Sequence, residues 1–137
     1  FLVSCDNAHA VHPAHPELSD PTHAPVLGGG IVIKYNAAQH YTTDGVSSAL
    51  FRLICEEAGV AAQDYANRAD MPGGSTLGNI SASQLSVCSV DIGIAQLAMH
   101  SCRETAGASD TEAMIRALTV FYEKTLICER DGEYKLL

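Results

Sequence analysis

The chain has 137 residues, long enough for one domain with a sizeable core, and its 47% hydrophobic against 18% charged residues indicate a globular rather than a disordered protein. Its net charge of −8 argues against nucleic acid as a partner, because binding phosphate requires a basic surface. No apolar run approaches the roughly 20 residues of a membrane span. Five cysteines without a Cys-x-x-Cys pair argue against a disulfide framework or a thiolate zinc site. We therefore expect a cytoplasmic protein with reduced thiols.

The first predicted element is a buried strand over residues 1–3, which leads directly into Asp6. Three histidines, His9, His12 and His15, follow that carboxylate within nine residues. Functional residues of α/β proteins are often found just after the ends of strands, so Asp6 occupies a position typical of a metal ligand or a catalytic acid. The alternative is a loop whose histidines are only solvated. Because domains usually begin at an exposed end, a core strand at the very start suggests a piece of a longer polypeptide.

A loop rich in proline and glycine spans residues 13–30, and loops of this length are often functional. The next predicted strand, residues 31–36, is apolar enough to be buried, yet Lys34 interrupts it. A lysine near a strand end usually extends its ammonium group into water, and that interpretation competes with a functional one.

The first predicted helix can be capped by Thr42 or Thr43 and runs to about residue 58. Gly59 suits the left-handed position after its last turn. Residues 60–68 are a weaker strand candidate.

Residues 68–79 are the second stretch that could carry chemistry. Two adjacent glycines allow close backbone approach, and Ser75 or Thr76 can cap a short helix that runs to about residue 84. Free amides at such a helix start favour an anionic group or a carbonyl oxygen. The alternative is an ordinary helix cap after a turn. The spacing does not match a nucleotide-binding loop of the Walker A type, which needs Gly-Lys before the Ser or Thr.

The last part of the chain is predicted to hold a buried strand over residues 87–94, after which the chain continues to His100. A lone histidine beside apolar residues is more often a structural group than a ligand. Asp110 is expected to cap the final helix, and residues 129–137 have the character of a tail or an edge element. We expect the apolar stripe of that helix to be buried, namely Met114, Ile115, Leu118, Phe121 and Tyr122.

The predicted elements alternate as strand, loop, strand, helix, strand, helix, strand and helix. This alternation predicts an α/β fold in which helices flank a mixed, largely parallel sheet. No internal repeat or linker divides the chain, so we expect one unit. Asp6, Lys34, the glycine loop and His100 all fall near element ends, where they can converge on one edge of the sheet.

Four stretches together resemble the M18 metallo-aminopeptidases, and most of all their aspartyl aminopeptidase branch. They are Ser-Cys-Asp-Asn-Ala-His-Ala-Val-His-Pro at 4–13, Val-Ile-Lys-Tyr-Asn at 32–36, Gly-Gly-Ser-Thr-Leu-Gly-Asn at 73–79 and Val-Asp-Ile-Gly-Ile-Ala-Gln-Leu-Ala-Met-His-Ser at 90–101. Four motifs in the family's order are more specific than any one alone. The resemblance covers nearly the whole chain. It implies that residues 1–137 are the C-terminal segment of one three-layer catalytic domain, with the upstream part and any inserted domain absent.

The resemblance also implies a two-zinc site, in which Asp6 is a carboxylate ligand of one metal and His100 an imidazole ligand of the other. Zinc takes both kinds of donor, and two zinc ions roughly 3.5–4 Å apart can share a hydroxide that attacks the scissile carbonyl. The family's other ligands, and the glutamate that serves as its general base, lie upstream of the matched residues. We therefore expect no catalytic residue in this chain, and we expect the chain alone to bind zinc weakly and to hydrolyse nothing.

In the aspartyl branch, the lysine that matches Lys34 faces the side chain of the substrate's N-terminal residue, where a fixed ammonium group selects Asp or Glu. His9 and His12 match family histidines that we expect to support the site rather than to bind metal directly. A loop of the family's site positions the substrate peptide, and its matching residues here are Gly74, Ser75 and Thr76. The family further implies a large homo-oligomer, often a dodecamer, that admits only peptides.

Two alternatives remain beside this zinc aminopeptidase. The first keeps the fold without the activity, as a catalytically inactive fragment with an assembly or binding role, and the missing base and ligands favour it. The second is a phosphate-binding module at residues 73–78. The net charge and the absence of a lysine in that loop argue against phosphate.

Overall fold

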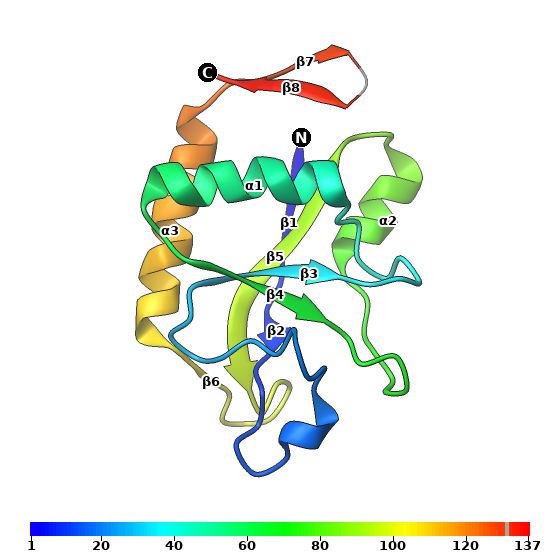
Figure 1. The fold of residues 1–137 in the computed structure, drawn as a ribbon, viewed down its shortest axis with the longest axis vertical. Coiled ribbons are helices and arrows are strands. Elements are labelled where there is room, and N and C mark those ends of the chain that lie inside the picture. Colours follow the sequence, from blue (N-terminus) through cyan, green and yellow to red (C-terminus); the bar gives the residue numbers. More distant parts are fainter. Residues whose placement is uncertain (131) are drawn as a thin grey trace.

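The computed structural model describes residues 1–130 and 132–137, in which strands and helices alternate along the chain (Figure 1). No helix in these residues is both long enough and apolar enough to cross a membrane. The strand predicted at 87–94 begins two residues later and ends three residues later, and the predicted tail at 129–137 belongs to a hairpin that begins at Leu126. In chain order the elements are β1 (Leu2–Cys5), β2 (Ala8–His9), the 3₁₀ helix η1 (Pro16–Leu18), β3 (Ile31–Tyr35), α1 (Gly45–Ala58), β4 (Ala62–Ala66), α2 (Leu77–Gln84), β5 (Ser89–Leu97), β6 (Thr105–Ala106), α3 (Ala108–Glu123), β7 (Leu126–Arg130) and β8 (Glu133–Leu136).

Strand β5 organises the main sheet, whose order is β1-β5-β3-β4, with the short strands β2 and β6 also paired to β5. β1 and β2 run parallel to β5, and β3 runs parallel to β4. β3 and β6 run antiparallel to β5. The predicted α/β fold with a mixed, largely parallel sheet is thus confirmed. β1 is an edge strand, because among the described residues its only partner is β5.

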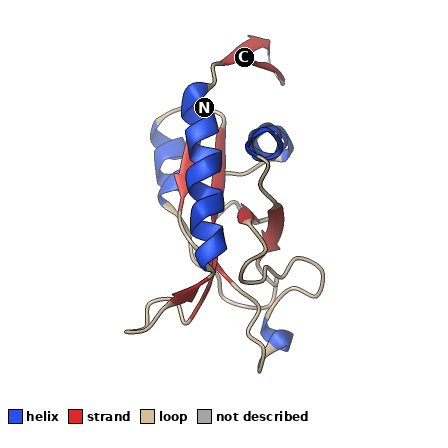
Figure 2. Ribbon diagram, turned by 90° about the vertical axis from the view of Figure 1, so that its left-hand side faces the viewer, coloured by secondary structure: helices blue, strands red, loops and turns tan. Residues whose placement is uncertain are grey.

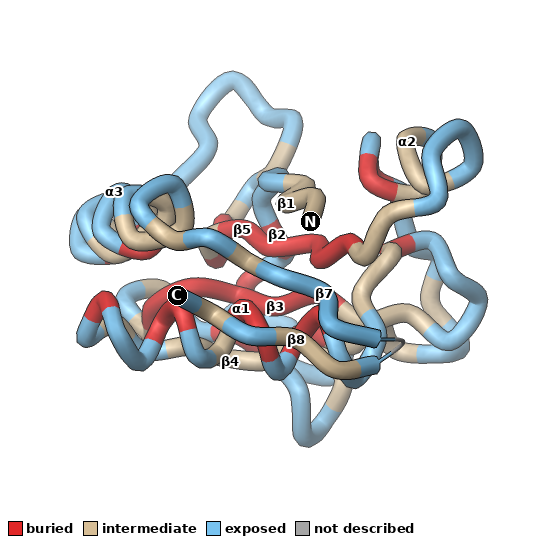
Figure 3. Tube along the Cα trace, turned by 90° about the horizontal axis from the view of Figure 1, so that it is seen from above, coloured by how far each residue is buried: buried red, intermediate tan, exposed pale blue. Residues whose placement is uncertain are grey.

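The two faces of the sheet carry different residues, because successive side chains of a strand point to opposite sides. Ile31 and Ile33 of β3 belong to the main core with α1 and α3, whereas Val32 belongs to a smaller core with two tyrosines. Buried residues gather on β3, on β5 and on the sheet-facing side of α1 (Figure 3). Helices α1, seen end-on, and α2 lie on opposite sides of the strands (Figure 2). The face opposite α1 is therefore the one covered by α2 and by loops.

Helix α1 begins one or two residues later than the predicted caps imply. Its N-cap is Asp44, whose carboxylate accepts a hydrogen bond from the Ser47 amide at 2.7 Å, while the Ser47 hydroxyl accepts one from the Asp44 amide. Thr42 and Thr43 bond to Asp91 of β5 instead, so a tertiary contact displaces the local cap. The predicted left-handed glycine after the helix is confirmed.

Asp110 does not cap α3, contrary to the prediction. The N-cap position is Gly107, and the Asp110 carboxylate is fully buried. It accepts hydrogen bonds from the amides of Gly28 at 2.7 Å and Gly30 at 2.9 Å. These two glycines have positive φ angles of 78° and 91°, so the backbone turns twice around the carboxylate. Asp110 thus fastens the end of the proline- and glycine-rich loop to α3.

The predicted apolar stripe of α3 is only partly buried. Met114, Leu118 and Phe121 pack against the core, but Ile115 is 62% exposed and Tyr122 is 81% exposed. The fully buried apolar residue of the helix is Ala117 instead. Because Ala117 is small, α3 can pack close to α1 and β5. The residues at the margins of the predicted stripe lie beyond this contact, in solvent.

Candidate functional site

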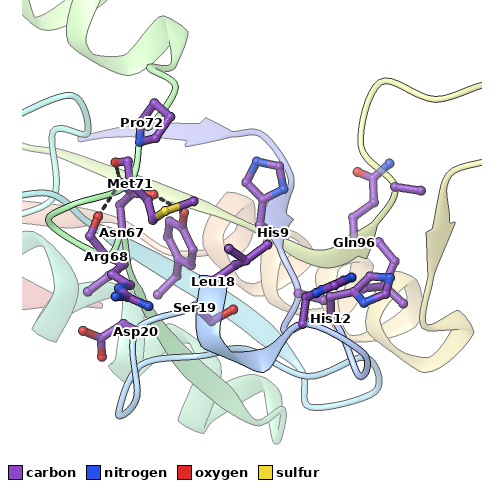
Figure 4. Close-up of a pocket in the computed structure, with 16 residues that line it drawn as sticks. His9, His12, Leu18, Ser19, Asp20, Asn67, Arg68, Met71, Pro72 and Gln96 are labelled. Atoms are coloured by element: carbon purple, nitrogen blue, oxygen red, sulfur yellow. Dashed lines mark hydrogen bonds between the residues drawn. The ribbon is translucent and has the colours of Figure 1, made fainter.

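Seven of the eight residues predicted for the site line one cavity of about 130 Å³. The cavity lies where the ends of β1, β3 and β5 meet the loop before α2. The eighth residue, His12, lines an adjacent cavity of about 280 Å³ (Figure 4). His9 lines both cavities and stands between them. The seven residues that converge are Asp6, His9, Lys34, Gly74, Ser75, Thr76 and His100.

Asp6 lies in a short break between β1 and β2. Pairing with β5 stops after Cys5 and resumes at Ala8 in unchanged register. The Asp6 amide still donates to the Ile92 carbonyl at 2.9 Å, while its side chain is 60% exposed. A Cβ on Gly93 would lie 2.0 Å from the Asp6 carbonyl oxygen. Glycine at position 93 therefore allows the Asp6 backbone to approach β5.

Lys34 is the buried cation of the site, with only 2% of the residue exposed. Its Nζ donates to the carbonyl oxygens of Asp6 at 3.1 Å and Asn7 at 3.2 Å, and lies 4.7 Å from the centroid of the Tyr41 ring. Burial lowers the pKa of Lys34, and the carboxylates of Asp6 and Asp91 oppose that shift. The interpretation in which this lysine extends into water is wrong. Two of the three ammonium protons bind backbone carbonyls, and the Asp6 carboxylate lies 3.8 Å from Nζ as its ion-pair partner.

The two imidazoles of the cavity come from different segments. His100 follows β5 on a turn with a left-handed φ of 67°, and its amide donates to Glu104 Oε1 at 2.6 Å. His9 belongs to β2. Partial burial lowers the pKa of His9, and the nearby His100 and Lys34 lower it further. His9 is therefore a neutral imidazole near pH 7, able to donate one hydrogen bond and accept another.

The loop before α2 forms another wall of the cavity. Thr76 occupies the N-cap position of α2, one of the two predicted positions, but its side chain makes no capping bond. Its buried Oγ1 has no hydrogen-bond partner among the residues that the structure describes. A Cβ on Gly74 would meet nothing within 4 Å, so internal packing does not require glycine there. A free hydroxyl and open backbone suit a ligand that enters the cavity.

The donor atoms of the site fit zinc in kind but not in number. The Asp6 carboxylate and the His100 imidazole line the same cavity, and both groups are ordinary zinc ligands. Within residues 1–130 and 132–137, no three His, Cys, Asp or Glu side chains are placed to hold a metal ion. Zinc takes three or four protein ligands. A complete zinc site would therefore need donors from outside these described residues.

Three residues near the site were not predicted from the sequence. The Tyr41 ring lies under the Lys34 ammonium group and packs on Tyr65, with 6.2 Å between ring centroids. Asn7 Nδ2 donates to Gln96 Oε1 at 2.7 Å, which joins the segment after β1 to β5. Asn7 and Gln96 both lie inside recognised motifs, but their pairing depends on strand register. Tyr41 has no distinctive sequence signal.

The chain was compared with protein families, curated proteins and solved structures. A family model described as "Aminopeptidase I zinc metalloprotease (M18)" matches residues 1–122. The "Probable M18 family aminopeptidase 2" of Ectopseudomonas mendocina is 48% identical over 122 residues, which are 89% of this chain and 28% of that protein. A chain of the Ape4 and Nbr1 complex superimposes with a TM-score of 0.87 at 38% identity, over 89% of this chain and 23% of its own length. The S. cerevisiae mApe1 dodecamer matches with a TM-score of 0.78 at 30% identity, over 88% of this chain and 26% of that one. The chain thus spans little more than a quarter of the curated relative.

Proposed function

Since the chain belongs to the M18 family of zinc metalloproteases, we propose that residues 1–137 are the C-terminal segment of one aminopeptidase catalytic domain. The whole protein hydrolyses N-terminal Asp or Glu from peptides, using water activated by two zinc ions. One observation carries this proposal: Asp6, Lys34 and His100 line a single cavity although they come from three separate segments. The remaining ligands and the general base belong to polypeptide outside this chain.

The residues of this chain have separate tasks in the proposed reaction. When bound, two zinc ions supply the positive charge that activates water and polarises the scissile carbonyl. Asp6 and His100 each provide one donor to that pair. Neutral His9 lies in the same cavity and supports the site by hydrogen bonding. The free Thr76 hydroxyl and the open backbone at Gly74 position the substrate peptide.

Lys34 selects the acidic side chain in this proposal. Its ammonium group is buried, so its charge acts in a region with little screening by water. Two of its protons are fixed on backbone carbonyls, which orients the third. A carboxylate of substrate Asp or Glu can accept that proton, whereas a neutral side chain makes no charge-assisted hydrogen bond with it.

We also propose that the whole protein assembles as a homo-oligomer such as a dodecamer, because a solved relative forms one. Enclosure of active sites inside such an assembly would limit substrates to peptides. The cytoplasmic location stays a prediction from the cysteine content.

The test of the proposed function uses the full-length protein and a peptide with N-terminal Asp. We expect cleavage that a zinc chelator abolishes and zinc restores, and we expect Asp6→Ala and His100→Ala each to lower the zinc content and the cleavage rate. Released Asp and bound zinc are measured together. Cleavage that survives complete removal of metal would contradict the proposal. The isolated 137-residue chain is the control, and there we expect weak zinc binding and no turnover; one tightly held zinc ion would contradict the assignment of the missing ligands.

Exchange of Lys34 for methionine tests substrate selection in the full-length protein. We expect the preference for N-terminal Asp over Leu, taken as a ratio of kcat/KM values, to fall about 10- to 150-fold, because a hydrogen bond to a charged group contributes roughly 1.5–3 kcal/mol. Any disturbance of Asp6 affects both substrates and cancels in the ratio. Arg52→Met is the matched control, since Arg52 pairs with Asp64 away from the cavity. An unchanged ratio in Lys34→Met would reject the assignment.

A further inference from the structure

The break between β1 and β2 places a candidate metal ligand on a segment that leaves the sheet for two residues. β1 and β2 pair with β5 in the same register on either side, so Asp6 and Asn7 bridge the gap without a shift. Asp6 keeps one bond to β5, from its amide to the Ile92 carbonyl, so the position of its carboxylate depends on the other contacts of this segment. His100, the other candidate ligand, follows the end of β5. The distance between Asp6 and His100 therefore depends on the contacts that fix residues 6 and 7 against β5.

Besides the hydrogen bond from the Asp6 amide to the Ile92 carbonyl, three features hold the segment in place. Gly93 presents no side chain, which lets the Asp6 carbonyl lie directly over β5. Lys34 binds the carbonyl oxygens of Asp6 and Asn7, and so holds the backbone from the side of β3. The third feature is the amide pair, in which Asn7 Nδ2 donates to Gln96 Oε1 at 2.7 Å. Gly93 and Lys34 do not connect Asn7 to β5, whereas the amide pair does.

We propose that the Asn7–Gln96 hydrogen bond is a positioning contact that fixes Asp6 relative to His100 and thereby sets the zinc affinity of the site. This inference rests on the proposed function. Gln96 is only 4% exposed and lies four residues before His100 on the strand that leads to it. Its side chain is thus a fixed acceptor on the His100 side of the gap. Asn7 is adjacent to Asp6, so the pair joins the two ligand-bearing segments through neutral groups.

The chemistry of the pair distinguishes its role from that of Lys34. An amide pair carries no net charge, so its loss leaves the charge of the cavity and the selection of acidic substrates unchanged. Loss of the bond should instead widen the range of positions open to Asp6. A ligand that is less well placed holds its metal less tightly, and partners that orient metal ligands typically change metal affinity about 10- to 100-fold.

The experiment is a double-mutant cycle in the full-length protein with Asn7→Leu, Gln96→Leu and the double variant. Zinc affinity is measured by competition with a chelator, and hydrogen exchange of the amides at residues 5–8 is measured without metal. We expect each single variant to bind zinc about 10-fold more weakly and to exchange faster at these amides, with KM for an Asp peptide nearly unchanged. The double variant should be no weaker than either single one. Gln84→Leu, an exposed amide at the end of α2, is the matched control.

Exchange rates separate the possible outcomes. Faster exchange confined to residues 5–8 supports a local role, whereas faster exchange also in β3 would mean general unfolding and reject the positioning role. Additive losses in the double variant, or single variants with wild-type zinc affinity, would overturn the inference. If the wild-type protein binds no zinc and cleaves nothing, the proposed function itself fails. In that case coupled exchange at residues 5–8 still reports on the hydrogen bond alone.

Discussion

An alanine at position 93 should destabilise the protein by about 3 kcal/mol and displace Asp6 from its place over β5. The added Cβ would lie 2.0 Å from the Asp6 carbonyl oxygen and 2.8 Å from its carbonyl carbon. Both atoms belong to the backbone, so no rotation of a side chain relieves the clash. Either β1 separates from β5 or the segment carrying Asp6 moves. Both changes remove the candidate ligand from the cavity.

The measurement for Gly93→Ala is urea unfolding of the full-length protein, together with its zinc content. Gly45→Ala is the matched control, because Gly45 begins α1 and a Cβ there would meet nothing within 4 Å. We expect that control to be neutral or stabilising by up to about 1 kcal/mol, since alanine has the higher helix propensity. A Gly93→Ala protein with wild-type stability and zinc content would show that β1 does not approach β5 as described.

Removal of the Asp110 carboxylate should cost about 3–5 kcal/mol, because it leaves two buried amide donors without an acceptor. Each unsatisfied buried donor costs roughly 1–3 kcal/mol, and the side chain also leaves a cavity. The affected amides are those of Gly28 and Gly30, so the end of the loop at 13–30 should detach from α3. The carboxylate also lies in the first turn of α3, where the helix dipole favours negative charge.

The series for this position is Asp110→Ala and Asp110→Asn, compared by urea unfolding. Asparagine keeps one acceptor oxygen, so we expect about half of the alanine effect. Glu112→Ala removes an exposed carboxylate from the same helix and should change the free energy of unfolding by less than about 0.5 kcal/mol. If Asp110→Ala were as stable as Glu112→Ala, the carboxylate would not be holding the loop.

Local sequence signals predicted where helices and strands lie, but they did not predict which side chains form long-range hydrogen bonds. Gly59 ends α1 as expected, because a left-handed residue after a helix is a local requirement. Asp110 has the chemistry of a helix cap and a position near a helix start, yet it binds amides about 80 residues earlier in the chain. Thr42 and Thr43 likewise serve Asp91 on a distant strand. A residue able to cap a helix is equally able to bind any other backbone amide, and only the folded chain decides between them.

The sequence predicted those site residues that lie in the motifs shared with the family. Asp6, Lys34 and His100 lie in three of the four short motifs, and the structure places all three around one cavity. Their metal and substrate roles stay predictions. The burial of Lys34 was not evident from its position near a strand end, because it depends on Tyr41 and on two carbonyls released by the break after β1. The Asn7–Gln96 pair depends on the same break, which no sequence pattern reveals.

The edge position of β1 determines how this chain would behave as a separate molecule. Among the residues that the structure describes, none pairs with the outer side of β1, and beside it runs a groove of about 520 Å³ lined in part by α2. Leu77 and Ile80 of that helix are 76% and 58% exposed. An open strand edge next to apolar side chains is a template for adding strands from other copies. A preparation of the isolated chain would therefore aggregate as its concentration rises, and any oligomer it formed would reflect this exposed edge rather than the proposed homo-oligomer.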